Sequence, residues 1–197
     1  MLTRRILMAT LAATAVAGKW AVAAELGDDG LHKQPWFLDS FLELGDDLAH
    51  AADRGRHLMI LFEQKGCPYC RELHQVNFTR PEITEYIKAN FDVIQLNLWG
   101  SREVMDFDGE VLEERDLAQK WGVNYTPTTL LFAAEAVGAQ SARDAESFRL
   151  PGYLKPFHYL SSLEYVETGE YRQQPFQRYL QDKFEALEKQ GIDPDVW

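Results

Sequence analysis

The protein has 197 residues and a formal net charge of −11, and 46% of its residues are hydrophobic. The length fits one globular domain, and the apolar content supplies a sizeable core and argues against a disordered chain. The acidic charge argues against nucleic acid or an anionic membrane surface as a partner, because both would repel the protein.

The first 24 residues have the pattern of a secretory signal peptide. Arg4 and Arg5 precede an apolar, alanine-rich run over residues 6–18, and small residues suited to cleavage follow at 21–24. The run is too short to span a bilayer, so no stable membrane anchor is expected; an uncleaved anchor is the alternative. The arginine pair partly matches a twin-arginine signal, so both the Sec and the twin-arginine export routes stay open.

Three further regions are expected after this segment. Residues 25–38 form a lead-in segment, whose part 25–36 is polar and rich in Gly and Asp and is predicted to be flexible. Residues 39–190 are expected to form one domain with a C-terminal helical extension, and residues 191–197 a tail. The sequence shows no internal repeat and no second domain.

Hydrophobic periodicity within the domain predicts alternating helices and strands. Helices are expected over residues 40–54, 68–78, 80–90, 110–121, 155–166 and 175–189, and strands over residues 57–64, 92–98, 128–132 and 148–150. The first helix would be capped by Asp39 or Ser40 and would bury Phe41. Polar loops are expected at 100–109 and 133–146. This order predicts an α/β fold with a central mixed sheet and helices on both of its faces.

The two cysteines of the chain, Cys67 and Cys70, directly follow the strand expected at 57–64. At this C-x-x-C spacing the thiols can switch between a dithiol and a disulfide. Pro68 suits the first position of a helix, and the free N–H groups and dipole of that helix would stabilise a thiolate at Cys67. The stretch predicts a thiol–disulfide oxidoreductase whose redox-active group is the Cys67–Cys70 disulfide, with no other cofactor.

Metal binding and a purely structural disulfide are the alternatives. A bridge that closes so short a loop restricts the unfolded chain little. A zinc site would need two further ligands, and the five histidines lack the usual H-x₃₋₅-H spacing. Residues 106–109 resemble part of a calcium loop, but Val104 and Arg115 would then occupy its first and twelfth positions. No metal site is therefore expected.

A second motif lies at Thr126 and Pro127, immediately before the strand expected at 128–132. A helix end, a short turn and X-Pro-Thr running into an apolar strand resemble the cis-proline segment of thioredoxins. A cis bond is accessible essentially only before proline. It would leave the N–H and C=O of Thr126 free to pair with an extended target segment. An ordinary proline at a strand start is the alternative.

The chain from about Phe41 to Val166 thus resembles a thioredoxin-fold protein. Further stretches resemble the exported SoxW-type thioredoxins of bacterial sulfur-oxidation systems; they are residues 97–104, 106–109, 149–157 and 175–180. The resemblance implies a thioredoxin fold with extra C-terminal helices and a periplasmic, monomeric reductase of disulfides in exported proteins. It also implies that a membrane thiol transporter supplies the electrons.

The same resemblance implies roles for individual residues. Cys67 would attack the target disulfide and Cys70 would resolve the mixed disulfide. Pro68, Tyr69, Thr126 and Pro127 would contact the target.

The motif also departs from ordinary thioredoxins. Gly66 replaces a Trp before the first cysteine, and the Pro68-Tyr69 pair is typical of glutaredoxins. Leu61 stands where thioredoxins carry a buried aspartate that accepts a proton. Glu63 is the nearest carboxylate and can transfer a proton through water, or it can be a solvated strand end.

These departures leave the direction of electron flow open. A disulfide oxidase or isomerase of the same fold is one alternative. A redox-silent binding or chaperone module that uses the cis-proline groove is the other.

Overall fold

The structure is a computed structural model that describes residues 25–193. The expected signal peptide and residues 194–197 of the expected tail lie outside the described residues. Within the described range, no helix is long and apolar enough to cross a membrane.

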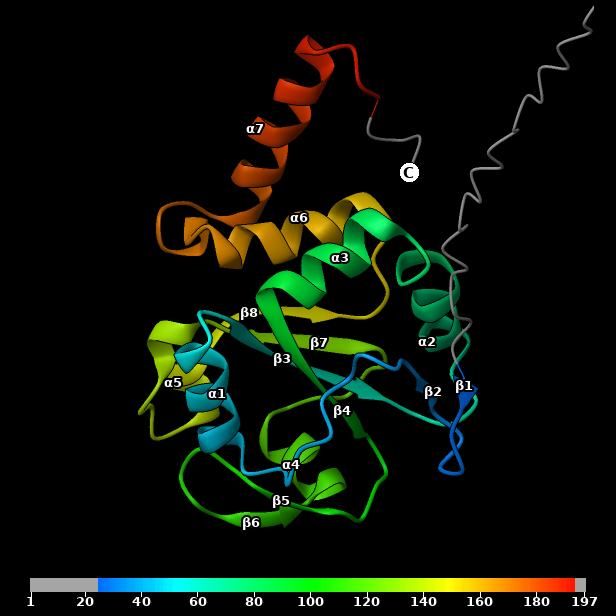
Figure 1. Cartoon of the computed structure of the whole chain (residues 1–197), viewed down its shortest axis with the longest axis vertical. Coiled ribbons are helices and arrows are strands. Elements are labelled where there is room, and N and C mark those ends of the chain that lie inside the picture. Colours follow the sequence, from blue (N-terminus) through cyan, green and yellow to red (C-terminus); the bar gives the residue numbers. More distant parts are fainter. Residues whose placement is uncertain (1–24, 194–197) are drawn as a thin grey trace, which may run out of the picture.

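A four-stranded mixed sheet forms the centre of the molecule (Figure 1). Its strand order is β4-β3-β7-β8, with β3 at His57–Glu63, β4 at Phe91–Asn97, β7 at Thr128–Phe132 and β8 at Glu146–Pro151. β3 pairs parallel with β4 and antiparallel with β7, and β7 pairs antiparallel with β8. Because β3 lies inside the sheet and both faces are covered, six of its seven residues are buried.

Helices cover both faces of the sheet, as the sequence predicted. On one face lie α1 (Leu44–Asp53) and α4 (Glu114–Lys120); on the other lie α3 (Pro81–Asn90) and α6 (Pro156–Glu167) (Figure 1). Successive residues of a strand point to opposite faces. Ile60 and Phe62 therefore pack with α1 and α4, whereas Leu61 packs with α3 and α6. Glu63 continues the second set, so its side chain points to the face of α3 and α6.

Two helical segments carry the chain from β3 to α3. α2 (Pro68–Glu72) continues directly into η1 (Leu73–Asn77), which has π-helical hydrogen bonding. Leu73 and Phe78 pack into the same core as Leu61, so this helix lies over the face to which Glu63 points.

The expected C-terminal helices are present. After α6 come a short 3₁₀ segment, η3 (Glu170–Arg172), and α7 (Phe176–Lys189), which projects away from the sheet (Figure 1). Phe176 and Tyr179 are half-buried against the core to which α6 contributes, and no residue of α7 is fully buried.

The segment 25–38 is not the flexible lead-in that its composition suggested. β1 (Glu25–Leu26) and β2 (His32–Lys33) pair antiparallel, and we call residues 25–33 the N-terminal hairpin. Gly30 adopts φ +77°, the left-handed conformation that a tight turn requires. Leu31 is buried, and the N–H of Leu38 donates to the carbonyl of Val93 at 2.7 Å. These contacts attach the segment to the edge strand β4.

The first helix begins later than predicted. Leu42 adopts φ +62°, which no helix accepts, so α1 starts at Leu44 and its cap is Glu43. Ser40 instead donates its hydroxyl to the carboxylate of Asp47 at 2.7 Å. Phe41, expected in the core, is 99% exposed.

The region 100–121 also differs from the prediction. Residues 110–113 are not helical, because β5 (Glu103–Met105) and β6 (Val111–Glu113) form a hairpin and α4 begins only at Glu114. Gly109, with φ +82°, allows the turn between the two strands. Three-residue strands are too short to show a period of two, which is why the pattern did not reveal them.

The expected loop 133–146 contains two short helical segments. They are η2 (Ala134–Ala136) and α5 (Ala142–Ala145), and the Ser141 hydroxyl caps α5 by accepting the N–H of Asp144 at 3.2 Å. The small side chains of Ala142 and Ala145 are buried against the core.

Candidate active site

Cys67 and Cys70 form a disulfide at the start of α2. Gly66, with φ +74°, turns the chain out of β3, and Pro68 occupies the first position of the helix. The sulfur of Cys67 is the cap of this helix and accepts the backbone N–H of Cys70 at 3.0 Å. Such a contact, together with the helix dipole, stabilises negative charge on sulfur.

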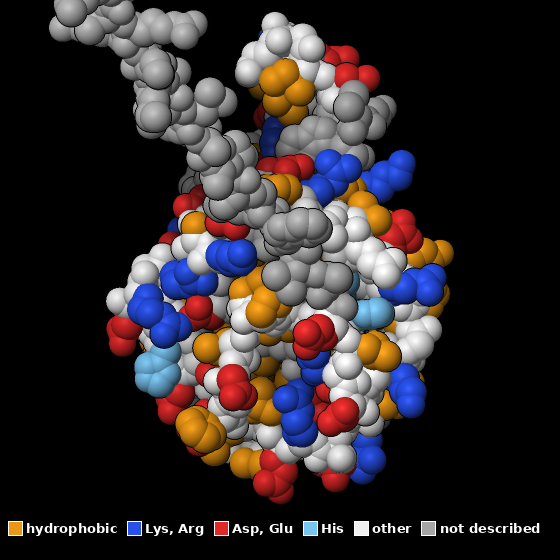
Figure 2. Space-filling view, turned by 45° about the vertical axis from the view of Figure 1, so that its right-hand side comes forward, with side chains coloured by type: hydrophobic (Ala, Val, Ile, Leu, Met, Phe, Trp, Pro, Cys, Tyr) orange, Lys and Arg blue, Asp and Glu red, His pale blue; other side chains and the backbone are white. Residues whose placement is uncertain are grey.

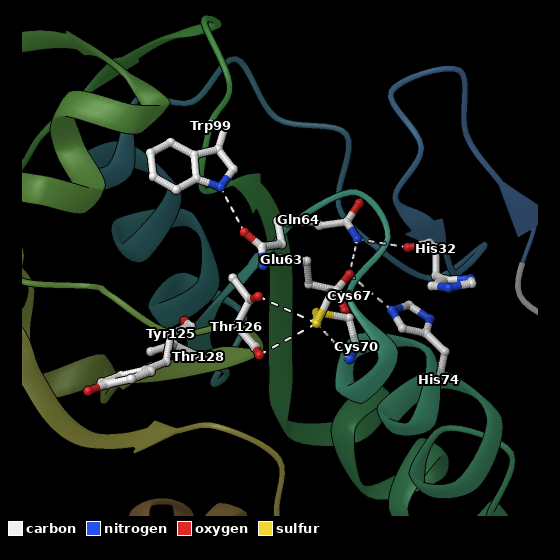
Figure 3. The surroundings of a disulfide bond; sticks show 11 residues. His32, Glu63, Gln64, Cys67, Cys70, His74, Trp99, Tyr125, Thr126 and Thr128 are labelled. Carbon is white, nitrogen blue, oxygen red and sulfur yellow. Dashed lines mark hydrogen bonds and ion pairs between the residues drawn. A yellow bond between two sulfur atoms is a disulfide. The ribbon is translucent and has the colours of Figure 1, made fainter.

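The structure places the second predicted motif against the first. The Thr126–Pro127 peptide bond is cis, and Thr126 lies beside Cys67 (Figure 3). The Thr126 hydroxyl donates to the sulfur of Cys67 at 3.4 Å. The Thr126 carbonyl oxygen lies 3.5 Å from the same sulfur, which is a contact rather than a hydrogen bond because a disulfide sulfur carries no proton.

Three exposed aromatic side chains belong to the segments that meet at the disulfide, and we call them the aromatic rim. Tyr69, Tyr125 and Trp99 are 58%, 68% and 70% exposed. The Trp99 indole N–H donates to Gln64 at 2.7 Å, which fixes the ring despite its exposure (Figure 3). Tyr69 stacks on Tyr153 with ring centroids 6.4 Å apart.

Sequence reasoning singled out Tyr69 but missed Trp99 and Tyr125. Tyr125 directly precedes Thr126, and Trp99 follows β4 by two residues. Since β3 and β4 are parallel, their carboxyl ends meet at one edge of the sheet, where Cys67 also lies. That topological signal was available from the predicted strands.

Behind the disulfide, Glu63 is fully buried, so its interpretation as a solvated strand end is wrong. Its Oε2 accepts hydrogen bonds from Nε2 of His74 at 3.1 Å and from the side-chain amide of Gln95 (Figure 3). No described residue donates to Oε1. A buried oxygen without a partner costs about 1–3 kcal/mol, so its presence in a folded protein calls for an explanation.

The helix explains why His74 reaches Glu63. Cys70 and His74 are four residues apart along the continuous α2–η1 helix, and both are only 1% exposed. Residues at this spacing lie on the same helix face, which here packs on the sheet. Glu63, which points to that face from β3, therefore lies with Cys70 and His74 on the inner side of the disulfide.

Two glutamines hold this buried group. Gln95 donates to the carbonyl of His32 at 2.7 Å and accepts from Lys33 at 2.7 Å, so both ends of its amide are bound. The amide nitrogen of Gln34 lies 3.1 Å from Nδ1 of His74. An amide nitrogen can only donate, so Nδ1 accepts and the ring proton sits on Nε2, which donates to the carboxylate.

The surroundings shift two neighbouring groups. Burial lowers the pKa of His32, and the nearby His74 lowers it further. Burial also raises the pKa of Tyr159, with the Glu63 charge adding to the shift. In the described residues, no group of three or more His, Cys, Asp or Glu side chains is arranged to hold a metal ion.

A family model of the thioredoxin-like domain matches residues 44–167. The chain therefore belongs to the family of thioredoxin-like domains. With the Cys67–Cys70 disulfide at the head of α2, it is a thioredoxin-like thiol–disulfide oxidoreductase.

Solved structures of similar fold include a thioredoxin-fold protein from Helicobacter pylori. It is 24% identical, the match covers 69% of this chain and 84% of that one, and the TM-score is 0.51. A thioredoxin from Thermus thermophilus is 26% identical over 63% of this chain and 83% of its own, with a TM-score of 0.49. The periplasmic thioredoxin SoxS from Paracoccus pantotrophus is 23% identical over 57% and 97%, with a TM-score of 0.36. The first of these supports the thioredoxin fold; no curated protein sequence matches significantly.

Proposed function

We propose that this protein is an exported reductase of protein disulfides, of the SoxW type, that acts in the periplasm on proteins of sulfur oxidation. The observation that carries the direction of the reaction is the buried carboxylate of Glu63 on the inner side of the disulfide. A buried negative charge disfavours further negative charge nearby. It therefore disfavours the thiolate forms of the cysteines and stabilises the disulfide, which makes the dithiol a better electron donor.

The contacts of Cys67 support the same direction. Its sulfur has one N–H and one hydroxyl donor, and no Lys, Arg or His among the described residues hydrogen-bonds to it. Strongly oxidising members of such a class owe their potential to a much stabilised reduced form. The two donors activate Cys67 as a nucleophile without that degree of stabilisation.

The proposed reaction has two exchanges. The Cys67 thiolate attacks one sulfur of the target disulfide, and the other target sulfur leaves as a thiolate. The Cys70 thiolate then attacks the sulfur of Cys67, which closes the Cys67–Cys70 disulfide and releases the second target sulfur. During the mixed disulfide the target lies along Thr126 and Pro127, with the N–H and C=O of Thr126 available to its backbone.

Glu63 is proposed to take the proton of Cys70 before the second exchange. Its free Oε1 is the acceptor, and the proton returns to Cys70 when the disulfide is next reduced. The carboxylate sits two residues beyond the place where thioredoxins carry their aspartate, but the alternation of β3 puts positions 61 and 63 on the same face.

Partners and location are part of the proposal. Residues 1–24 serve as an export signal, by the Sec or the twin-arginine route, and the mature chain works as a monomer. Reduction in an oxidising compartment requires an electron supply, for which we propose a membrane thiol transporter. The disulfide is the redox group, with no further cofactor.

Equilibration with glutathione tests the direction. A reduction potential near ~−270 mV is expected for a reductase, whereas ~−120 mV would establish an oxidase instead. Reduction of insulin by the dithiol form tests the activity itself. Absence of insulin reduction would leave the chain as a binding module and overturn the proposal.

A further inference from the structure

The N-terminal segment reaches the buried side of the disulfide. Gln34, which follows β2 by one residue, is only 7% exposed and contacts His74 of η1 across 40 residues of sequence. The turn of the N-terminal hairpin also touches the loop that precedes Cys67. A Cβ atom at Gly30 would lie 2.7 Å from the Cγ atom of Lys65. This segment therefore contacts the active site at two places, η1 and the loop before Cys67.

The imidazole of His74 has little freedom. Its Nδ1 is bound by Gln34 and its Nε2 by Glu63. The rings of Phe37 and Phe78 pack edge-on against it, with their centroids 5.8 and 5.1 Å from that of the imidazole. Because the ring is only 1% exposed and both of its nitrogens are hydrogen-bonded, its tautomer and the direction of its N–H are fixed.

The hydrogen bonds from His74 and Gln95 restrict the carboxylate of Glu63. With His74 and Gln95 both on Oε2, the carboxylate of Glu63 cannot rotate without breaking two buried hydrogen bonds, so Oε1 stays on the opposite side. We propose that Gln34 and His74 are positioning residues for the resolving step: they hold Glu63 so that Oε1, to which no described residue donates, is kept for the proton of Cys70.

This inference rests on the proposed proton transfer from Cys70 to Glu63. In the resolving step the proton passes from the Cys70 sulfur to Oε1, and the electron pair left on that sulfur forms the bond to Cys67. The bond between Cys67 and the target sulfur breaks, and the target leaves as a thiolate. Neither Gln34 nor His74 gains or loses a proton.

Other charged groups also face the pair and bear on any pH profile. His32 of β2 lies with its ring centroid 5.4 Å from that of His74, and Arg71 of α2 acts on His32. Lys33 reaches the site through Gln95, and Tyr159 of α6 is close enough for the Glu63 charge to raise its pKa. A variant at His74 therefore has to be compared with the wild type over a pH series.

The test measures the two exchanges separately by acid quenching after the dithiol form is mixed with insulin. For His74→Leu, which removes the donor but fills the space, formation of the mixed disulfide should be unchanged. Its resolution should slow by about tenfold, part of the 10²–10⁴ that positioned proton transfer supplies. The pH profile of the resolving rate should also change, and His74→Gln, which restores an N–H donor, should recover much of the rate.

Gln34→Met provides a second variant that leaves His74 and Glu63 in place. It should slow resolution by about threefold, because only the orientation of the ring is loosened. His57→Gln is the matched control, since His57 lies at the far end of β3 and its Nδ1 accepts the N–H of Ala134 at 3.0 Å. It should leave both exchanges unchanged.

Wild-type resolution rates in folded His74→Leu and Gln34→Met would overturn the inference. So would an equal slowing of both exchanges, which would indicate a general structural effect. Failure of the wild type to reduce insulin would instead contradict the proposed function, so the two failures are distinguishable.

Discussion

The two sides of the disulfide are formed by different kinds of chemical groups. The outer side, at Cys67, presents backbone groups of Thr126, one hydroxyl and the exposed aromatic rim. The inner side, at Cys70, is closed by buried polar side chains from the N-terminal segment, β3, β4 and η1. The cysteines themselves differ little in exposure, at 6% and 1%.

This contrast shows how one disulfide can hold two thiols with separate tasks. The outer contacts can be exchanged for those of an extended target, because backbone N–H and C=O groups pair with any sequence. Apart from Oε1 of Glu63, the inner polar groups are buried and hydrogen-bonded within the chain, so they act on charge and protons. Substitutions on the outer side should therefore affect target binding, and substitutions on the inner side should affect rates.

The largest expected effect separates the two cysteines. Cys67→Ser should reduce insulin turnover to the uncatalysed rate, because no thiolate remains to attack the target. Cys70→Ser should still perform the first exchange and accumulate a mixed disulfide with the target, visible by non-reducing electrophoresis and mass spectrometry. A mixed disulfide formed by Cys67→Ser through Cys70 would reverse the assignment of outer and inner thiol.

The aromatic rim should give an intermediate effect that is confined to binding. Trp99→Ala and Tyr125→Ala should each raise KM for a protein disulfide about fivefold, corresponding to ~1 kcal/mol for an interface aromatic, with little change in kcat. A small disulfide such as oxidised glutathione should be reduced at wild-type rates. The matched control is Val137→Ala, an exposed apolar residue that follows η2, beyond the opposite end of β7. A fall in kcat without a change in KM would show that the aromatic rim does not contribute to target binding.

The smallest expected effect is a loss of stability in acid through His32, next to the inner side of the disulfide. Burial lowers the pKa of His32 below its ordinary value of 6.5, so the unfolded chain binds more protons at this site than the folded chain does. The contribution of neutral His32 to the free energy of unfolding is therefore fully present above pH 6.5. It is lost as the pH falls from 6.5 towards the pKa of His32 in the folded protein. The loss should stay below ~1 kcal/mol, because the ring is partly exposed to solvent.

Urea unfolding at neutral and at mildly acidic pH measures this contribution. The free energy of unfolding should fall less between the two conditions in His32→Gln than in the wild type. Identical changes in both proteins would show that the N-terminal hairpin does not sense protonation at this site.

Most of the sheet could be predicted from the sequence, and so could the cysteine and cis-proline motifs of the outer side, because each depends on local signals. Each of these signals lies within a few residues of sequence: an apolar run, Pro68 after Cys67, and Pro127 before a strand that begins with β-branched residues. Trp99 and Tyr125 of the aromatic rim were missed. The inner side depends on tertiary contacts. Neither Gln34 nor His74 belongs to a motif, and they meet because the chain returns to one sheet face.

The same distinction explains the errors in the elements. The three-residue strands β5 and β6 have no pattern of their own, and the burial of Glu63 follows from the cover that η1 provides. The left-handed conformation of Leu42, which delays α1, is supported by its surroundings rather than by its residue type.

The N-terminal hairpin also bears on what counts as the unit of this protein. A polypeptide trimmed to the family match at residues 44–167 would keep both cysteines, the cis-proline and the Glu63–His74 pair, and would still contain the whole family match. It would lack Gln34 and the hairpin, and water would reach the imidazole that they enclose. The smallest fully functional fragment should therefore be longer than the homologous domain, and any transplant of this site into another thioredoxin scaffold should carry residues 25–38 with it.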